Sequence, residues 1–297
     1  MASSIAKAPL RRRGTLVSAG VVLAVCGLLT IGCARKNAAP ALASEELKRF
    51  QGLSGAIAIA GGTAHLPVMN EAVRRISAVN PDIRITVGGG GSGVGVKMVG
   101  EGLVDIGNTG RAITEKERAA YGLIAFPFAL DGVSIVVHPS NPVAALSAEQ
   151  MKKLYSGEIV DWSDVGGPKG AVHLIMRDEA SGTREVFWET LLGKGPIKSG
   201  AIAAPSNGAV RVAVGNDPLA IGYTSMGHVD ETVKAIAIDG HAPTHENAVS
   251  GKYPVVRKLF MNTKGRPNEL VQAFIDYLRG PEGDAIVRGA GFIPIKE

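Results

Sequence analysis

A strand, a glycine-rich turn and a helix follow one another twice between residues 55 and 102, and this pattern constrains the fold more than any other feature. Apolar residues at 55–60 and alternating apolar residues at 83–87 predict two strands, and the patterns at 66–79 and 94–102 predict the helices that follow them. A third strand is expected at 103–106. Because a short apolar run bounded by glycines is typical of a parallel strand buried on both faces, the segment predicts an α/β fold.

The rest of the chain continues this alternation. Further strands are expected at residues 132–139, 172–177, 220–225 and 233–239, and further helices at 147–155, 179–192, 267–279 and 281–290. We find no internal repeat of solenoid period and no low-complexity segment after residue 50. The two C-terminal helices suggest that the chain ends by returning to its first compact unit.

The positive charge of the chain is concentrated in its N-terminal leader. The net charge is +5, and the first 32 residues contain Lys7 and the three arginines 11–13 but no Asp or Glu. Subtracting these four from the 32 Lys and Arg residues leaves 28 against 27 Asp and Glu, a net charge of +1. Composition therefore gives no support to a nucleic-acid partner. At 297 residues the chain is long enough for two compact units or one large α/β unit.

The leader has the order of an export signal. Residues 14–32 form an uncharged, mostly apolar run behind the arginines. Cys33 follows directly, and the residues before it resemble a lipobox, in which cleavage occurs before a cysteine that carries lipid; Thr30 stands where an aliphatic residue is usual. We predict a signal peptide at 1–32, lipid attachment at Cys33 and a tether at 33–54. An uncleaved anchor and another cleavage site are the open alternatives, because the run is also long enough to span a bilayer.

Cleavage before Cys33 would remove Cys26, the other of the two cysteines. The exported protein would then have no internal disulfide and no cysteine metal site. Its stability would come from burial of a core, which about 250 residues can supply.

Three junctions between a strand and a helix combine glycines with small hydroxyl residues. They are Gly61-Gly62-Thr63-Ala64, Gly91-Ser92-Gly93 and Ala180-Ser181-Gly182-Thr183. The first N–H groups of a helix have no partner inside the helix and lie at the positive end of its dipole, and glycine lets a ligand approach the backbone closely. One such junction is usually only a cap and a tight turn. Three in one α/β chain predict an oxyanion site where the strands end.

Arg177 ends a predicted strand four residues before Ser181. An arginine at the end of a strand is commonly a solvated charge at the rim of the sheet. Here Asp178 and Glu179 lie beside it, where they could hold the guanidinium in place, and the Ser-Gly-Thr turn adds donors. Together these residues predict a guanidinium that is held in position to bind a tetrahedral oxyanion.

Two nucleotide-binding motifs are not fulfilled. Gly88, Gly90 and Gly93 match the spacing of a dinucleotide-binding turn, but no acidic residue lies about 20 positions later at the end of a second strand. Lys97 follows a valine rather than glycine, and Met98 stands where a P-loop has a hydroxyl residue. We therefore expect no nucleotide cofactor.

Signals for catalysis are weak. Ser92 and Ser181 have no G-x-S-x-G frame, and no nucleophile has an attendant base. His241 and His245 are four residues apart, but Pro243 between them argues against a helical metal pair. We expect neither catalytic residues nor a metal ion, and the chain is predicted not to be an enzyme.

Several segments, in order, resemble one family. They are Gly61-Gly62-Thr63 with Pro67, GGGSGVGVK, DIGNTGR, DGVSIVVHPSNPV, LSAEQMKKLYSGEIVDWSDVGG, RDEASGTREVF and NDPLAIGY. The sequence from about Gly55 to about Pro294 resembles the phosphate-binding protein of bacterial phosphate ABC transporters, the PstS family. The segments YSGEIVDW and RDEASGTRE are the most specific of these.

The resemblance implies a two-lobed periplasmic solute-binding protein fold of type II-like topology, with the ligand in the cleft between the lobes. Lobe 1 is expected at 55–132 and 227–297 and lobe 2 at 133–226. The implied function is capture of inorganic phosphate and its delivery to the transmembrane subunits of an ABC permease, by a monomer held at the membrane through its lipid. The implied phosphate ligands are Thr63, Ala64, Ser92, Arg177, Ser181, Gly182 and Thr183, with Glu179 orienting the guanidinium.

Gly110 departs from the family pattern. The resemblance implies an Asp at this position, which accepts the proton of phosphate and so rejects sulfate. Gly110 has no side chain, and Asp131 or Asp178 are the alternative acceptors in the sequence. Sulfate, molybdate, arsenate and organic phosphates therefore stay open as ligands, as does a sensor that binds the anion without transport. A phosphohydrolase with the same anion site is the enzyme alternative.

Overall fold

In the computed structural model of the protein, which describes residues 44–295, two large hydrophobic clusters organise the strands and helices. We call the residues around the first cluster the first lobe (44–130 and 258–295) and those around the second the second lobe (133–255). The predicted signal peptide and Cys33 lie outside the described residues. Among residues 44–295, no helix is long and apolar enough to cross a membrane.

The first lobe contains the two expected strand–turn–helix units and the C-terminal helices. Its elements are η1 (Leu47–Phe50), β1 (Gly55–Gly61), η2 (Thr63–His65), α1 (Leu66–Val79), β2 (Ile83–Gly90), α2 (Ser92–Gly100), β3 (Ile106–Thr109), α3 (Glu115–Tyr121), α8 (Glu269–Arg279), α9 (Pro281–Gly289) and β11 (Ile293–Pro294). Helix α1 buries Val68, Met69, Ala72 and Ile76 on one face. Strand β1 lies between β2 and β3 and is parallel to both, as the apolar run predicts.

The second lobe is built from shorter elements. They are β5 (Ala145–Leu146), α4 (Ala148–Ser156), η3 (Trp162–Val165), β6 (His173–Arg177), α5 (Gly182–Thr190), β7 (Ile202–Ala204), α6 (Asn207–Gly215), β8 (Ala220–Ser225), η4 (Met226–His228), β9 (Lys234–Ile238) and α7 (His245–Val249). Helix α4 begins with a capping box formed by Ser147 and Gln150. It ends at Gly157, whose φ of 84° suits glycine.

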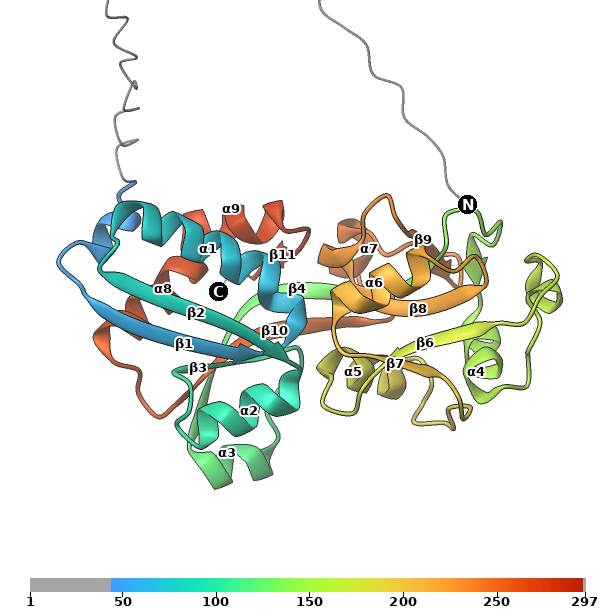
Figure 1. Ribbon diagram of the computed structural model, residues 1–297, viewed down its shortest axis with the longest axis horizontal. Coiled ribbons are helices and arrows are strands. Elements are labelled where there is room, and N and C mark those ends of the chain that lie inside the picture. Colours follow the sequence, from blue (N-terminus) through green and yellow to red (C-terminus); the bar gives the residue numbers. More distant parts are fainter. Residues whose placement is uncertain (1–43, 296–297) are drawn as a thin grey trace, which may run out of the picture. The chain divides into compact units, whose positions relative to one another are not determined.

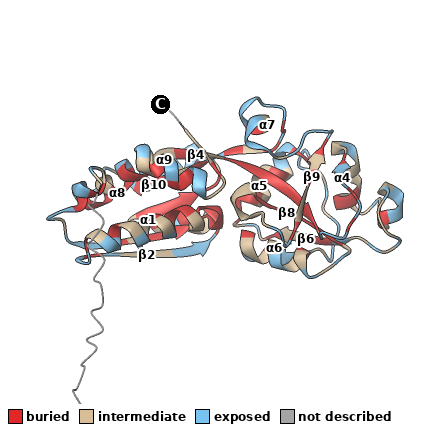
Figure 2. Ribbon diagram, turned by 90° about the horizontal axis from the view of Figure 1, so that it is seen from above, coloured by how far each residue is buried: buried red, intermediate tan, exposed pale blue. Residues whose placement is uncertain are grey.

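Two antiparallel strands connect the lobes (Figure 1). Strand β4 (Leu123–Val137) pairs with β10 (Val256–Lys264) from Leu123 to Gly132, and then pairs with β8 and β9 in the second lobe. The strand order along the sheet is β2-β1-β3-β10-β4-β8-β6-β7. Figure 2 shows buried residues along β4 between the lobes, and mainly exposed residues on the edge strand β2.

The return to the first lobe, expected at residue 227, lies at about residue 256. The buried side chains of Ile236, Ile238, Tyr253 and Val255 pack in the second cluster, so the chain stays in the second lobe until β10 begins. The first of the two crossings lies near Gly132, where β4 leaves β10 and pairs with β8.

Two strands differ from the sequence prediction. The strand predicted at 103–106 lies at 106–109, because the chain first turns at Gly102 (φ 74°) and leaves Leu103 63% exposed. The strand predicted at 132–139 begins nine residues earlier, at Leu123. Both differences place polar residues inside strands.

Candidate functional site

A small cavity lies where the two lobes meet. Its lining consists of Gly62, Thr63, Ala64, Gly91, Ser92, Gly110, Arg177, Ser181, Gly182, Thr183 and Arg257. The seven residues predicted as ligands are all among them. Three distant parts of the sequence therefore meet at one place, as the three glycine-and-hydroxyl junctions predict.

Arg177 is the buried cation of this cavity from the second lobe. It ends β6 and is 1% exposed. Its Nε donates to the carbonyl oxygen of Ala204 at 3.0 Å, and its Nη2 donates to that of Pro205 at 3.2 Å. Burial lowers the pKa of Arg177, but a guanidinium is so strong a base that it keeps its charge at neutral pH. Main-chain carbonyls thus fix the fork while leaving N–H groups for a ligand.

Glu179 does not hold this guanidinium in the structure. Its side chain is exposed, and the hydrogen bonds of the Arg177 side chain go to Ala204, Pro205 and Thr63. The orienting role expected for Glu179 is filled by carbonyl oxygens of the segment between β7 and α6, because the guanidinium turns into the lobe interface and away from the exposed loop.

Three of the four hydroxyl oxygens that line the site already accept hydrogen bonds. Thr63 Oγ1 accepts from the backbone N–H of Asn207 at 3.2 Å and from its Nδ2 at 3.0 Å. Ser92 Oγ accepts from the backbone N–H of Gly110 at 2.9 Å, and Ser181 Oγ accepts from that of Arg184 at 3.2 Å. The hydroxyl protons of these three residues are therefore available to donate to a ligand, whereas Thr183 Oγ1 donates to Asn207 Oδ1 at 3.4 Å.

Helix N-termini add backbone donors to the same cavity. Ser92 begins α2, and Gly182 and Thr183 begin α5. The first N–H groups of a helix have no acceptor within the helix and lie at the positive end of its dipole. Ala64 lies in η2, directly before α1. Such a lining favours an anion.

The lobes are closed over the cavity. Gly93 of the first lobe donates its backbone N–H to the carbonyl oxygen of Ala180 in the second, at 3.0 Å. Arg111 of the first lobe forms an ion pair with Glu185 of the second, with 2.7 Å between Nε and Oε2. The bonds between Thr63 and Asn207 also cross the interface. Closure brings the donors of both lobes to one small volume and removes bulk water from it.

Two residues of the site were not predicted from the sequence. Arg257 of β10 lines the cavity with its guanidinium, and it was missed because β10 itself was not expected. Arg257, Leu259 and Met261 share one buried face of the strand, so a period of two was present as a signal. Asn207, which ties Thr63 to the second lobe, follows a serine cap that the sequence analysis did not use.

Two histidines lie behind the cavity and are uncharged at neutral pH. Burial lowers the pKa of His65 to about 3, with the positive charge of Arg257 as the second cause. Burial also lowers the pKa of His228, whose Nε2 lies 3.1 Å from the carbonyl oxygen of Thr63. Within residues 44–295, no three His, Cys, Asp or Glu side chains are grouped so that they could hold a metal ion.

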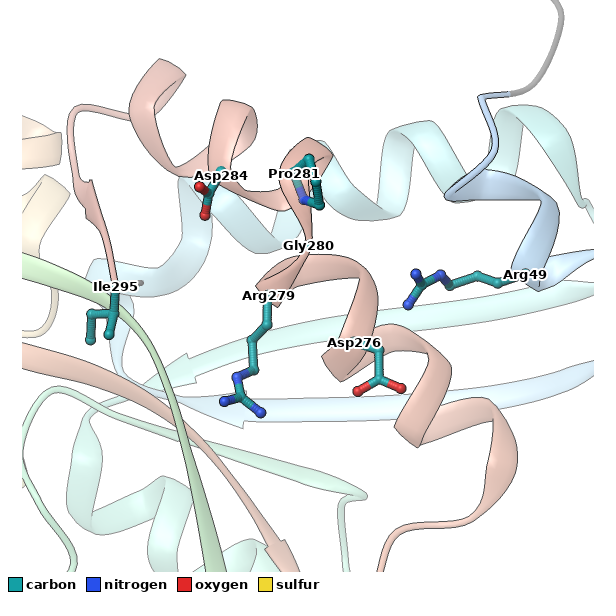
Figure 3. Close-up of a pocket in the computed structure, with 7 residues that line it drawn as sticks. All are labelled: Arg49, Asp276, Arg279, Gly280, Pro281, Asp284 and Ile295. Carbon is teal, nitrogen blue, oxygen red and sulfur yellow. The ribbon is translucent and has the colours of Figure 1, made fainter. Parts of the chain in front are cut away.

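A larger hollow elsewhere has a different character (Figure 3). Its volume is about 480 Å³, and it is lined by Arg49, Asp276, Arg279, Gly280, Pro281, Asp284 and Ile295. Acidic and basic side chains both line it. Glu46 Oε2 already accepts the backbone N–H of Glu282 at 2.7 Å, so a carboxylate occupies the N-terminus of α9. None of the predicted ligand residues lies there.

Comparison with known proteins gives consistent matches. A family model described as a PBP superfamily domain matches residues 39–282. The phosphate-binding protein PstS of Bacillus subtilis is 31% identical over 280 residues, which cover 93% of this chain and 93% of that protein.

Solved structures are also similar. A phosphate ABC transporter substrate-binding protein from Clostridium perfringens, with bound phosphate, has a TM-score of 0.77 and 30% identity, covering 82% of this chain and 100% of that one. An ABC-type phosphate transport receptor from Vibrio cholerae has a TM-score of 0.65 and 30% identity, covering 80% and 99%. The α/β fold is that of the two-lobed periplasmic binding proteins, and the chain belongs to the PBP superfamily and, within it, to the PstS family.

Proposed function

We propose that this chain is an extracytoplasmic substrate-binding protein that captures inorganic phosphate and delivers it to the transmembrane subunits of an ABC permease. The observation that carries the proposal is the closed cavity between the lobes, where Arg177, four hydroxyl groups and three helix starts converge. Relatives with the same fold are named phosphate-binding proteins or phosphate transport receptors.

Binding requires no chemistry on the ligand. In an open form each lobe would present half of the donors, and closure would place the anion among all of them in a medium of lower dielectric constant. A hydrogen bond to a charged group contributes about 1.5–3 kcal/mol net, and a micromolar affinity corresponds to about 8 kcal/mol. A few well-placed donors are therefore enough, and the loss of two would abolish useful binding. The strands β4 and β10 connect the lobes and are the natural hinge.

Calorimetric titration with inorganic phosphate tests the proposal. The purified protein is first unfolded and refolded to remove any anion carried through purification. We expect one binding site per chain with a dissociation constant in the micromolar range or below. A refolded protein that releases no heat with phosphate, and whose melting temperature phosphate leaves unchanged, would refute the proposal.

Export and lipid attachment at Cys33 are part of the proposal. They rest on the leader, its arginines and the resemblance to a lipobox. Mass spectrometry of the protein isolated from membranes should find an N-terminal lipidated cysteine, and Cys33→Ala should abolish the attachment. A retained leader would instead indicate an uncleaved anchor. We also propose that the protein is a monomer, which its mass in solution by light scattering will check.

A phosphohydrolase would need a nucleophile or an activated water next to the anion. We propose a binding protein rather than an enzyme, in keeping with the names of its relatives. Incubation with a generic phosphoester at concentrations that saturate the site should release no phosphate above the uncatalysed rate. Release that is lost in Arg177→Ala would favour the enzyme instead.

A further inference from the structure

A buried ion pair lies on the strands that connect the lobes. Arg257 of β10 and Asp131 of β4 are directly opposite each other in the antiparallel register. Arg257 donates from Nε at 2.8 Å and from Nη2 at 2.7 Å to Oδ2 of Asp131. Their side chains are 3% and 0% exposed. Such a paired fork fixes the guanidinium in one orientation.

Asp131 has no acceptor capacity left for a ligand. Its Oδ1 accepts from Ser225 Oγ at 2.8 Å and from the backbone N–H of Met226 at 3.1 Å. With the two bonds from Arg257 at Oδ2, all four lone-pair positions of the carboxylate are used. Asp131 is also not among the residues that line the cavity. It therefore cannot take the proton of a bound anion.

The remaining edge of the Arg257 guanidinium faces the cavity beside Gly110. Its Nη1 lies 3.3 Å from the carbonyl oxygen of Gly110. A Cβ atom at position 110 would lie 2.5 Å from this nitrogen and 2.9 Å from Cζ. The guanidinium thus occupies the space that any side chain at position 110 would need. Position 110 therefore cannot carry an acidic side chain while Arg257 keeps its present place.

The cavity consequently presents mainly donors, and the hydroxyl of Thr183, which donates to Asn207 Oδ1 at 3.4 Å, is its one lining hydroxyl shown as a donor within the protein. Arg177 and Arg257 both line it, and the hydroxyl oxygens of Thr63, Ser92 and Ser181 already accept hydrogen bonds from the protein. No Asp or Glu is among its lining residues. The dianion of phosphate still carries one O–H group, which the hydroxyl oxygen of Thr183 can accept, and sulfate carries none, so both anions can be satisfied without a carboxylate. The monoanion of phosphate carries a second O–H group, for which the lining side chains offer no further acceptor.

The ionisable groups around the site support a simple pH response. His65 and His228 lie behind it, in η2 and η4, and burial lowers the pKa of both, so they stay uncharged from neutral pH upwards. Asp178 follows β6 and has a buried Oδ1 with no hydrogen-bond partner within the described structure, but it does not line the cavity. The ligand is then the main group whose charge changes near neutral pH.

We propose that Arg257, in place of an acceptor at position 110, makes this a site for divalent tetrahedral oxyanions as a class. The inference rests on the proposed function and deepens it. Phosphate is bound as its dianion, with a higher affinity than the monoanion, and sulfate is bound at the same site. A site built around an acceptor for the ligand's O–H would reject an analogue without it by a factor of about 10⁴–10⁵. Here we expect the two affinities to agree within about tenfold.

Calorimetry of the full-length protein at about pH 6 and about pH 8, with inorganic phosphate and with sodium sulfate, tests this. Phosphate affinity should rise with pH, because phosphate changes from monoanion to dianion over this range, while sulfate affinity should change by less than about twofold. Phosphate binding without sulfate binding would overturn the inference and leave the proposed function standing. If neither anion binds, the proposed function itself fails.

Two variants separate the roles of the carboxylates and of Arg257. Asp178→Asn should leave the ratio of phosphate to sulfate affinity within about twofold of its value in the unaltered protein. A rise in relative sulfate affinity would identify Asp178 as the proton acceptor and overturn the inference.

Arg257→Gln is combined with Asp131→Asn, because removing the arginine alone would leave an unpaired buried carboxylate. The pair should weaken sulfate binding at least tenfold, by loss of a charge-assisted hydrogen bond. If the double variant does not fold, the comparison of phosphate and sulfate binding by the unaltered protein still tests the proposal.

Discussion

Gly93 donates its backbone N–H to the carbonyl oxygen of Ala180 across the lobe interface, at 3.0 Å. This contact joins the start of α2 in the first lobe to the loop before α5 in the second. The two backbones can meet because glycines lie on one side. A Cβ atom at Gly91 would lie only 2.6 Å from the same carbonyl oxygen. Closure of the lobes over the cavity therefore depends on the absence of a side chain at Gly91.

Gly91→Ala should lower phosphate affinity by at least about tenfold, because the new methyl group meets rigid second-lobe backbone only when the lobes are closed. Gly91 has a φ of 89°, so the substitution also costs about 1 kcal/mol of folding free energy or more. Gly102→Ala is the matched control. Its φ is 74°, but nothing lies within 4 Å of the added Cβ, so it has the strain without the collision. Calorimetry that finds both variants equally impaired would contradict the closure argument.

The ion pair between Arg111 and Glu185 should stabilise the closed form modestly. Their Nε and Oε2 atoms lie 2.7 Å apart, but the Glu185 side chain is 38% exposed, so solvent screens the interaction. Exposed pairs contribute about 0.2–1 kcal/mol, which predicts a loss of affinity of up to about fivefold for Glu185→Gln, less at high salt. Glu189→Gln is the control, since Glu189 pairs with Lys194 inside the second lobe. Equal affinities for both variants would show that the pair does not contribute to closure.

Arg177 should be indispensable for binding. Arg177→Ala is expected to cost about 2–5 kcal/mol of phosphate binding, because it removes a buried, hydrogen-bonded charge. Arg177→Lys restores a charge but not the fork that Ala204 and Pro205 hold, so it should recover only part of the affinity. Arg118→Ala, which removes an arginine that is 48% exposed on α3, controls for net charge. Unchanged phosphate affinity in Arg177→Ala would show that the site has been assigned wrongly.

Local sequence patterns predicted most of the elements, because they reflect local physics. The apolar run of β1 and the serine cap of α4 could be identified from a few neighbouring residues. Strand β10 was missed, since Arg257, Lys258 and Asn262 interrupt its apolar pattern. The charge of Arg257 can be buried because Asp131, 126 residues earlier in the sequence, lies opposite it on β4. The residues next to Arg257 and to Asp131 in the sequence do not indicate this pairing.

The candidate site was predictable to the same extent. All seven predicted ligands line the cavity, since each belongs to a strand-to-helix junction that a short motif describes. The residues that hold these ligands in place by hydrogen bonds could not be predicted. The carbonyl oxygens that hold Arg177 come from Ala204 and Pro205, whose side chains give no sign of the role. Likewise, Gly110 looks like a missing acceptor until Arg257 is found beside it.

His65 should make the protein less stable in mild acid. It is fully buried behind the site, its Nε2 lies 3.2 Å from the carbonyl oxygen of Phe260, and burial lowers its pKa from 6.5 to about 3. Between these values the unfolded chain binds a proton that the folded protein does not, so the free energy of unfolding falls as pH falls below about 6.5, by up to about 1.4 kcal/mol per pH unit. His65→Gln, which can keep the bond to Phe260, should flatten this slope in urea unfolding between about pH 4.5 and about pH 6.5. The exposed His241→Gln should leave the slope as it is; if both variants behave alike, His65 is not the group responsible.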